Sequence, residues 1–298
     1  MSRPDSFVPP AVARARTLAT SRGGFAAIEA APAGQQLGTV LMLPGFTGSK
    51  EDFNALLEPV AAGGYRVVAV DGRGQYESAP PASPDGYARA ELAADVLAQA
   101  EALGAPVHLL GHSFGGQVGR AAAIAEPGSF RTFTMMSSGP AAISQSEKAR
   151  AKLLLDALAV MTMEEVWEAM RRMEPLEEAP VVPAAPAAPG AAGGRPAAPT
   201  DAGDLRRRWL ATDPAQLVAA AGQLVAEPDR VAELAATGLP VHVVSGVQDG
   251  VWPPELLDDM ARRLGARRTT VAGAGHSPNT DRPARTAAAL LAFWDAHR

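Results

Sequence analysis

Ser113 lies in a glycine-rich pentapeptide, residues 111–115 (Gly-His-Ser-Phe-Gly), that matches the pattern G-x-S-x-G. The apolar run 107–110 precedes this pentapeptide, and an alanine-rich helical pattern, 113–125, follows it. In a sharp turn from strand to helix, small residues let the backbone close and the serine hydroxyl projects above the sheet. We therefore predict that Ser113 is a nucleophile, although a serine that caps a helix after an ordinary turn would leave a similar sequence.

A serine hydroxyl is a poor nucleophile without a base, and the chain has five histidines. His276 lies in a glycine-containing loop, 273–278, between the last predicted strand and the last predicted helix. We predict that His276 is the base, although a loop histidine could also be exposed without a role. We expect the His112 ring, inside the pentapeptide, to pack away from the site. The other histidines, in apolar strand patterns or near the C-terminus, are His108, His242 and His297.

A catalytic imidazole needs a carboxylate that fixes its tautomer and stabilises its cation. Asp249 follows the apolar run 241–245 and therefore lies at the carboxyl end of a predicted strand. Asp258 and Asp259 fall within the following helical pattern and are less suitable. We predict that Asp249 is the acid. The alternative is a turn aspartate that precedes a glycine.

An acyl-transfer site also needs donors for a developing oxyanion. The backbone N–H of Phe114, directly after the nucleophile, is one predicted donor. The backbone N–H of Phe46 is the other, because Phe46 lies in residues 43–48, here called the Pro44 loop, after an earlier predicted strand. The alternative is that Pro44 and Gly45 form a simple turn.

Short apolar runs alternate with longer helical patterns in both terminal parts of the chain. This alternation predicts βαβ units and a parallel sheet with helices on both faces. The carboxyl ends of parallel strands meet at one edge, where ligands bind, and this brings the three predicted residues together. The predicted strands are 25–30, 39–43, 65–70, 107–110, 130–136, 241–245 and 268–272, and the predicted helices are 52–61, 87–103, 113–125, 253–264 and 281–297.

The stretch 138–236 shows helical patterns and no strand pattern. We predict a core domain of residues 1–137 and 237–298, interrupted by a helical cap or lid, 138–236. Within that insertion, the Ala/Pro/Gly-rich tract 179–203 is expected to be a flexible linker, because it cannot bury enough apolar area to order itself. The predicted helices of the insertion lie within 144–173, 204–211, 213–226 and 228–235.

The insertion carries many large apolar side chains. We expect most of them to pack the insertion onto the core, and we predict that Trp167 and Met170 line an apolar acyl pocket, since methionine adapts to varied ligands. The large apolar residues are Leu153, Leu154, Leu155, Met161, Met163, Trp167, Met170 and Met173.

The composition excludes several classes of protein. Of the 298 residues, 47% are hydrophobic and 20% charged, as in an ordinary globular protein. The net charge of −5 argues against a nucleic-acid binder, and the basic run 206–208 is too short to change this. Without cysteine, a disulfide, a thiol nucleophile or a cysteine-ligated metal site is impossible. No stretch approaches the ~18 apolar residues of a membrane span or resembles a secretory signal, so we expect a cytoplasmic protein.

Taken together, the chain resembles the α/β-hydrolase fold superfamily, specifically its capped serine esterases and lipase-like hydrolases. In this family the chain order is Ser, Asp, His, as here. One departure is that members commonly carry His-Gly where this chain has Pro44 and Gly45. The matching segments are 44–48, 71–75, 111–116, 246–249 and 275–276.

The resemblance implies an α/β-hydrolase fold, with a mostly parallel central sheet and a helical cap. It implies hydrolysis of a carboxylic ester through an acyl-enzyme at Ser113, without a metal or organic cofactor, and it gives residues 71–75 a structural role. The expected substrate is a small, apolar acyl compound. A thioesterase, an acyltransferase or a peptidase would use the same three residues, and a non-catalytic ligand-binding protein of this fold is a further alternative. The sequence leaves the oligomeric state open.

Overall fold

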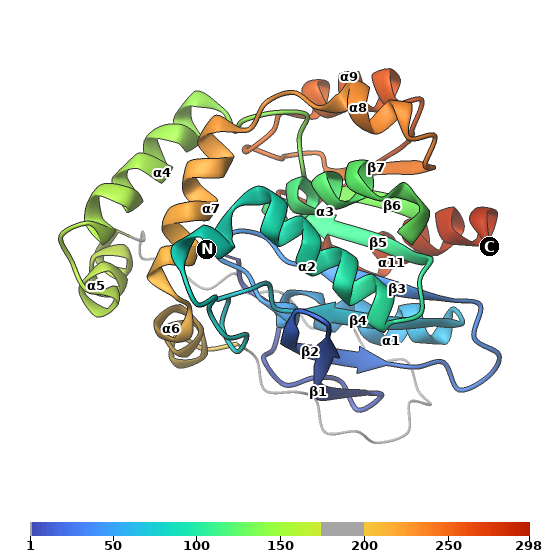
Figure 1. Ribbon diagram of the computed structural model, residues 1–298, viewed down its shortest axis with the longest axis horizontal. Coiled ribbons are helices and arrows are strands. Elements are labelled where there is room, and N and C mark those ends of the chain that lie inside the picture. The colour runs from blue at the N-terminus through green and yellow to red at the C-terminus, as the bar shows by residue number, and fades with distance from the viewer. Residues whose placement is uncertain (1, 174–199) are drawn as a thin grey trace.

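The computed structural model describes residues 2–173 and 200–298, and its centre is one twisted sheet (Figure 1). Eight strands of the described residues form this sheet in the order β1-β2-β4-β3-β5-β6-β7-β8. The pairs β1–β2 and β2–β4 are antiparallel, and all other pairs are parallel. The strands are β1 (Ala13–Thr20), β2 (Gly23–Ala30), β3 (Gly38–Leu43), β4 (Tyr65–Val70), β5 (Val107–His112), β6 (Phe130–Met136), β7 (Val241–Gly246) and β8 (Arg267–Val271). The predicted α/β fold with a mostly parallel sheet is confirmed.

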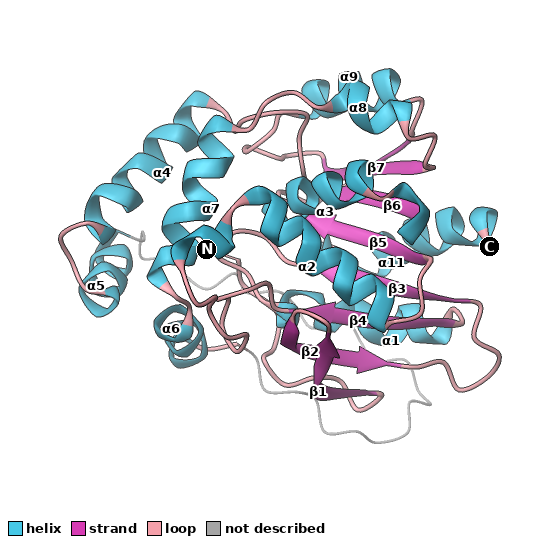
Figure 2. Cartoon of the chain, viewed as in Figure 1, coloured by secondary structure: helices cyan, strands magenta, loops and turns pink. Residues whose placement is uncertain are grey.

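Helices cover both faces of the sheet, and each face has its own apolar core. On one face the buried side chains of α2, α3, α8 (Val231–Ala236) and α9 pack against the strands, and on the other those of α1 and α11 do so. Figure 2 shows the alternation of strands and helices that makes this possible. The helices flanking the sheet are α1 (Asn54–Ala62), α2 (Arg89–Ala102), α3 (Phe114–Ala125), α9 (Pro254–Leu264), α10 (Pro278–Asp281) and α11 (Pro283–Trp294), and the 3-10 helix η1 (Lys50–Phe53) precedes α1.

Strand β1 is an element that the sequence patterns did not predict. It is an edge strand that pairs only with β2 in the sheet order. Arg14 and Arg16 are exposed or half-buried, and of its eight residues Leu18 alone is buried. An edge strand with one buried side chain lacks the apolar alternation by which strands are recognised. Its existence depends on the hydrogen bonds that β2 offers.

The chain between β6 and β7 forms helices in its described part, α4–α8, which gather mostly beyond one edge of the sheet (Figure 1). Most of the predicted linker lies outside the described residues. Its last part differs from the prediction, because the Asp201 side chain accepts a hydrogen bond from Asp204 N at 2.8 Å and caps a helix that includes Ala202 and Gly203. The helices are α4 (Gln145–Leu158), α5 (Met163–Met173), α6 (Ala202–Ala211), α7 (Pro214–Ala226) and α8 (Val231–Ala236).

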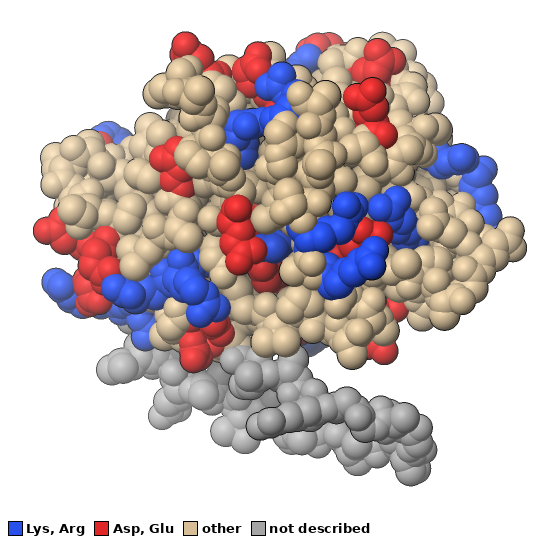
Figure 3. Space-filling view, turned by 60° about the horizontal axis from the view of Figure 1, so that its bottom comes forward, with Lys and Arg blue, Asp and Glu red and all other residues tan. Residues whose placement is uncertain are grey.

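The surface carries charges of both signs close together, as Figure 3 shows for one face. Many of them are paired, such as Arg22 with Glu91 at 2.6 Å. Among the described residues, no helix is long and apolar enough to cross a membrane.

Three histidines of the sheet strands are buried, and this makes stability depend on pH. Burial lowers the pKa of His108 and His112 from 6.5 to about 4 and that of His242 to about 3. His108 and His242 each hydrogen-bond a threonine hydroxyl, at 2.9 and 2.8 Å. Below pH 6.5 the unfolded chain therefore binds protons that the folded chain does not, and the free energy of unfolding falls as the pH falls toward 4.

We expect each of these histidines to contribute up to about 1.4 kcal/mol per pH unit in this range. Urea unfolding of the wild type and of His242→Gln at pH 7, 6 and 5 measures the effect. The amide of glutamine can hydrogen-bond Thr269 but does not titrate, so the variant should lose less stability on acidification. Equal losses in the two proteins would contradict the prediction.

Candidate active site

Ser113 occupies a strained turn between β5 and α3. Its backbone has φ 53° and ψ −119°, a conformation that costs a non-glycine residue about 1–3 kcal/mol. The turn is held in place because Ser113 N donates to Met136 O at 2.9 Å. It also needs Gly115, where a Cβ would lie 2.5 Å from the carbonyl oxygens of both Leu43 and Pro44. The predicted sharp strand-to-helix turn is therefore present, and it presses against the Pro44 loop.

The tertiary structure brings together the three residues that the sequence singled out. His276 Nε2 lies 3.1 Å from Ser113 Oγ, and His276 Nδ1 lies 3.0 Å from Asp249 Oδ1. Because a carboxylate only accepts, Nδ1 carries the proton and donates it to Asp249, which leaves Nε2 as the acceptor for the serine hydroxyl. Ser113 and Asp249 are buried, and His276 is half-buried. The arrangement can withdraw a proton from a serine hydroxyl.

Asp249 is held as a charged carboxylate. Burial alone would raise its pKa, but the hydrogen bond and charge of His276 and two backbone donors outweigh that effect, and the pKa of Asp249 is lowered. The backbone donors are Val251 N at 3.0 Å and Trp252 N at 3.3 Å. The Trp252 ring is fully buried and its centroid lies 6.1 Å from that of His276. Sequence reasoning did not give Trp252 a role, although it lies three residues after the acid.

His112 lies beside the site, and the expectation that its ring packs away from the site was wrong. Its Nε2 lies 2.9 Å from the backbone oxygen of His276, and the two rings are 5.2 Å apart. Burial, with the neighbouring His276, lowers the pKa of His112 to about 4, so the ring is neutral near pH 7 and Nε2 donates to that carbonyl. The turn at Ser113 directs the preceding side chain toward the His276 loop (residues 272–277), which alternation along a strand did not indicate.

The two predicted oxyanion donors come from segments that touch. None of the hydrogen bonds among the described residues uses the backbone N–H of Phe46 or Phe114. The Pro44 loop is fixed by Gln75, whose Nε2 donates to Gly45 O at 2.9 Å while its Oε1 accepts from Gly72 N at 2.9 Å. Gln75 belongs to the segment 71–75, and its individual role was not predicted because nothing in the sequence shows which loop it meets.

The comparison with protein families decides what kind of protein this is. The sequence model described as the alpha/beta hydrolase family matches residues 40–289, a range that includes Ser113, Asp249 and His276. The chain belongs to the alpha/beta hydrolase family. A protein of Variovorax paradoxus (strain S110) named as a carbamate hydrolase, RutD, is 40% identical to this alpha/beta hydrolase over 89 residues. Those residues are 30% of this chain and 33% of the relative, so the match spans a third of the relative's length.

Solved structures share the alpha/beta hydrolase fold over nearly the whole chain. A hydrolase from Pseudomonas aeruginosa PA01 has a TM-score of 0.70 and 23% identity, covering 94% of this chain and 98% of the other. A thermophilic esterase from Thermogutta terrifontis has a TM-score of 0.70 and 21% identity, covering 96% and 100%. An enol-lactonase from Burkholderia xenovorans LB400 has a TM-score of 0.72 and 18% identity, covering 94% and 100%. At these identities the similarity establishes the fold alone.

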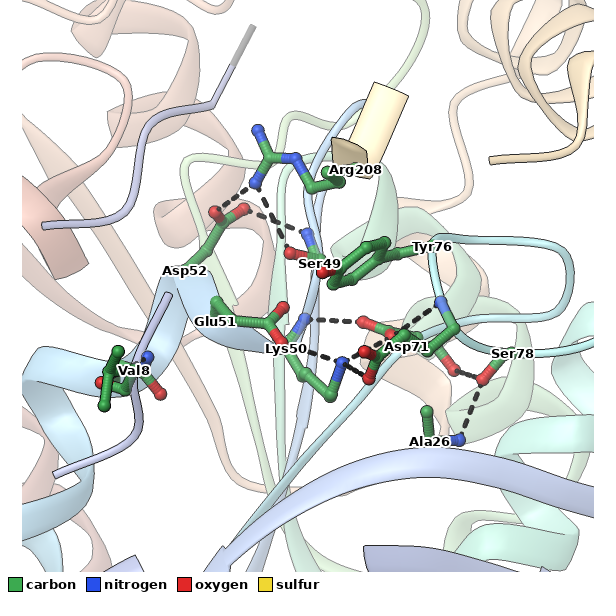
Figure 4. Close-up of polar contacts among 12 residues, drawn as sticks. Val8, Ala26, Ser49, Lys50, Glu51, Asp52, Asp71, Tyr76, Ser78 and Arg208 are labelled. Carbon is green, nitrogen blue, oxygen red and sulfur yellow. Dashed lines mark hydrogen bonds and ion pairs between the residues drawn. The ribbon is translucent and has the colours of Figure 1, made fainter. Parts of the chain in front are cut away.

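Figure 4 shows a polar cluster around the buried Lys50 of this alpha/beta hydrolase, just after the Pro44 loop. Lys50 Nζ lies 2.9 Å from Asp71, 2.8 Å from Glu51 and 2.6 Å from Glu77. Burial raises the pKa of Asp71, and the charge of Lys50 opposes that rise. The cluster joins the segment 71–75 to the chain that follows the Pro44 loop, and so helps to fix both.

Trp167 and Met170 pack inside the insertion. Both belong to an apolar cluster with Leu205 and Trp209, and Phe46 of the Pro44 loop packs against the same cluster. Trp167 is buried and Met170 half-buried. The contact with Phe46 places this cluster next to a predicted oxyanion donor.

A cavity of about 40 Å³ lies behind the Pro44 loop. Phe114, Gly115 and Gln75 line it, together with Gln99 and Gln216, but neither Ser113 nor His276 does. It is therefore not the place where a substrate carbonyl would meet the serine. Among the described residues, no group of three or more His, Cys, Asp and Glu side chains could hold a metal ion.

Proposed function

We propose that this alpha/beta hydrolase cleaves a carboxylic ester, or a related acyl bond, with Ser113, His276 and Asp249 as its catalytic triad. The observation that carries the proposal is the chain of contacts from Ser113 Oγ to His276 and on to Asp249, at 3.1 and 3.0 Å. Two further features support it: the strained backbone at the serine and the lowered pKa of Asp249. Strained backbone and perturbed carboxyl groups are typical of functional sites.

The proposed reaction has two stages. Ser113 Oγ forms a bond to the acyl carbon while its proton moves to His276 Nε2, and Asp249 stabilises the resulting imidazolium. The backbone N–H groups of Phe46 and Phe114 hold the oxyanion. The bond to the leaving group then breaks, and the leaving group takes the proton from His276. In the second stage His276 takes a proton from a water molecule as that water bonds to the acyl carbon. The bond from the acyl carbon to Ser113 Oγ then breaks, and His276 returns the proton to Oγ, which regenerates Ser113.

A second candidate is hydrolysis of a carbamate. The relative from Variovorax paradoxus carries that name, and its similarity to this chain, although confined to a third of its length, is the strongest in sequence among those described above. The same triad would attack a carbamate carbonyl. Thioesters, amides and acyl transfer to an alcohol remain alternatives, and analysis of the products in the presence of a competing alcohol separates hydrolysis from transfer.

A fluorophosphonate probe tests the proposal directly, because it reacts with serines that a base has activated. We expect one equivalent of label on Ser113, located by mass spectrometry of the digested protein. A panel of p-nitrophenyl esters, p-nitrophenyl carbamates, lactones and thioesters then ranks the substrate classes by kcat/KM. If Ser113 resisted the probe and the protein turned over none of these compounds, the proposal would be refuted.

We further propose that the insertion acts as a cap and that Trp167 and Met170 shape its acyl pocket. Met170→Ala should lower the ratio of kcat/KM for p-nitrophenyl octanoate to that for the acetate by about tenfold, because each lost apolar contact is worth about 1–3 kcal/mol. Trp167→Ala should lower the same ratio. The measurement is the chain-length profile of each purified variant.

Leu153→Ala is the matched control, since Leu153 also lies in the insertion but its side chain is exposed. We expect its chain-length profile to equal that of the wild type. Met170→Ala leaves the aromatic residues of the insertion intact, and carries the test if Trp167→Ala does not fold. A folded, active Met170→Ala protein with an unchanged profile would remove Met170 from the pocket.

A further inference from the structure

The basic run 206–208 on α6 divides between the surface and the interior. Arg206 pairs with Glu164 of α5, and Arg207 pairs with Asp204 one turn away at 2.5 Å, so both ion pairs stay within the insertion. Arg207 Nε also donates a surface hydrogen bond to Tyr76 Oη at 3.3 Å. Both arginines are exposed, whereas the Arg208 side chain is 1% exposed. A buried guanidinium needs a charged partner in the interior. The partner of Arg208 lies outside the insertion.

Arg208 reaches from the insertion to the chain that follows the Pro44 loop, as Figure 4 shows. Its Nη1 donates to Asp52 Oδ1 at 3.0 Å and to Ser49 Oγ at 3.4 Å. Its Nη2 donates to the backbone oxygen of Ser2, and its guanidinium lies 5.3 Å from the centre of the Phe7 ring. The Asp52 side chain is 0% exposed, so this ion pair is fully shielded from water.

Asp52 is at the same time bonded to residues that lie just beyond both loops of the proposed site. Its Oδ2 accepts from Ser49 N at 3.3 Å, directly after the Pro44 loop. Its backbone oxygen accepts from Asn279 Nδ2 at 2.7 Å. Asn279 lies in α10, three residues after His276. The carboxylate also lies against Gly48 so closely that a Cβ there would overlap it. A shift of Asp52 would therefore move the Pro44 loop and the His276 loop together.

We propose that Arg208 is a positioning residue, whose ion pair with Asp52 makes the geometry of the triad and oxyanion donors depend on docking of the insertion. The inference rests on the proposed function. A buried carboxylate cannot stay buried without its partner, because the unpaired charge costs several kcal/mol. When the insertion leaves the core, the Asp52 carboxylate must turn toward water, so it loses its contact with Ser49 N, and the backbone whose oxygen Asn279 binds is no longer held in place by the ion pair. The fraction of molecules with a docked insertion then equals the fraction with the catalytic geometry.

The test compares Arg208→Met with Arg207→Met, which removes the same group from the exposed side of the same helix. For Arg208→Met we expect kcat on the best ester of the panel to fall ~10–100-fold, as for a misplaced reacting group, with KM within about threefold of wild type. The rate of fluorophosphonate labelling at Ser113 should fall by a similar factor. Arg207→Met should stay within about twofold of wild type in all three quantities.

Combination with Asp52→Asn separates coupling from two independent effects. If Arg208 acts through Asp52, the double variant Arg208→Met/Asp52→Asn should be slower than the wild type, because the ion pair that holds Asp52 is still absent, but no slower than the slower single variant. The double variant also removes the unpaired buried charge, and so carries the measurement if Arg208→Met does not fold. Circular dichroism and thermal unfolding establish that each protein is folded.

Three outcomes would overturn the inference: wild-type kcat in folded Arg208→Met or in the folded double variant, a change in KM alone, or multiplicative losses in the double variant. Failure of the proposed function looks different, because the wild-type protein itself would then neither take up label at Ser113 nor hydrolyse the panel. Normal labelling of the wild type together with equal labelling of Arg208→Met would refute the positioning role and leave the triad standing.

Discussion

Ser113→Ala is expected to lower kcat by about 10⁵–10⁶-fold while the protein remains folded. The hydroxyl oxygen is the atom that would bond to the acyl carbon, and no other serine in the described part of the chain hydrogen-bonds to a histidine ring. Alanine has the same Cβ as serine, so the strained backbone at this position is no less accessible to it. The measurement is steady-state turnover of the best substrate of the panel, with thermal unfolding as the check on folding.

Ser138→Ala is the matched control for this change. Ser138 is also a fully buried serine, and it packs against Gly116 of the first turn of α3. Its Oγ has no hydrogen-bond partner among the described residues, so its removal leaves no partner unpaired. We expect kcat within about threefold of wild type. If Ser113→Ala retained a hundredth of wild-type turnover, Ser113 would not be the nucleophile.

His276→Ala is expected to lower kcat about as much as the loss of Ser113, because members of a triad act as a unit. Without the imidazole, the hydroxyl at 3.1 Å has no acceptor for its proton. The second-order rate of fluorophosphonate labelling at Ser113 should fall in parallel. Stopped-flow or gel-based labelling measures that rate without a substrate, so it separates activation of the serine from binding of an acyl group.

His297→Ala serves as the control for the loss of His276. His297 lies in the last turn of the chain, and its ring hydrogen-bonds the Phe293 carbonyl at 2.8 Å. We expect normal labelling and turnover in that variant. Labelling of Ser113 in His276→Ala at the wild-type rate would mean that another base activates the serine. His112 makes no hydrogen bond to Ser113 Oγ among the described residues, because its Nε2 is bonded to the His276 carbonyl.

The elements of the core were largely predictable because each carries its signal locally. The bounds of β4 (Tyr65–Val70) and β6 (Phe130–Met136) agree with the prediction, because buried parallel strands read as short apolar runs bounded by turn residues. Strand β1 was missed because the stability of an edge strand comes from its neighbour. The last predicted helix, 281–297, is divided in the structure, since Pro283 begins α11 after the short helix α10.

The contacts around the site show the limit of sequence patterns. Gln75, His112 and Arg208 are ordinary polar residues in their local sequence. His112 was expected to pack away from the site, and Arg208 was given no individual role. Each acts on a backbone or a carboxylate far away in the chain: Gln75 on Gly45, His112 on His276, and Arg208 on Asp52. A hydrogen bond between distant segments leaves no periodicity or spacing in the sequence.

The sequence by itself determined where the serine turn must be, and which aspartate and histidine follow strands of a parallel sheet. It could do so because a strand-to-helix turn needs small residues at fixed offsets, and because parallel strands end at a common edge. Only the tertiary structure decided that the imidazole lies 3.1 Å from the hydroxyl, and that a buried arginine of the insertion binds Asp52, whose carboxylate accepts from Ser49 and whose backbone oxygen accepts from Asn279. Distances of that size depend on how whole elements pack, and packing is a property of the complete fold.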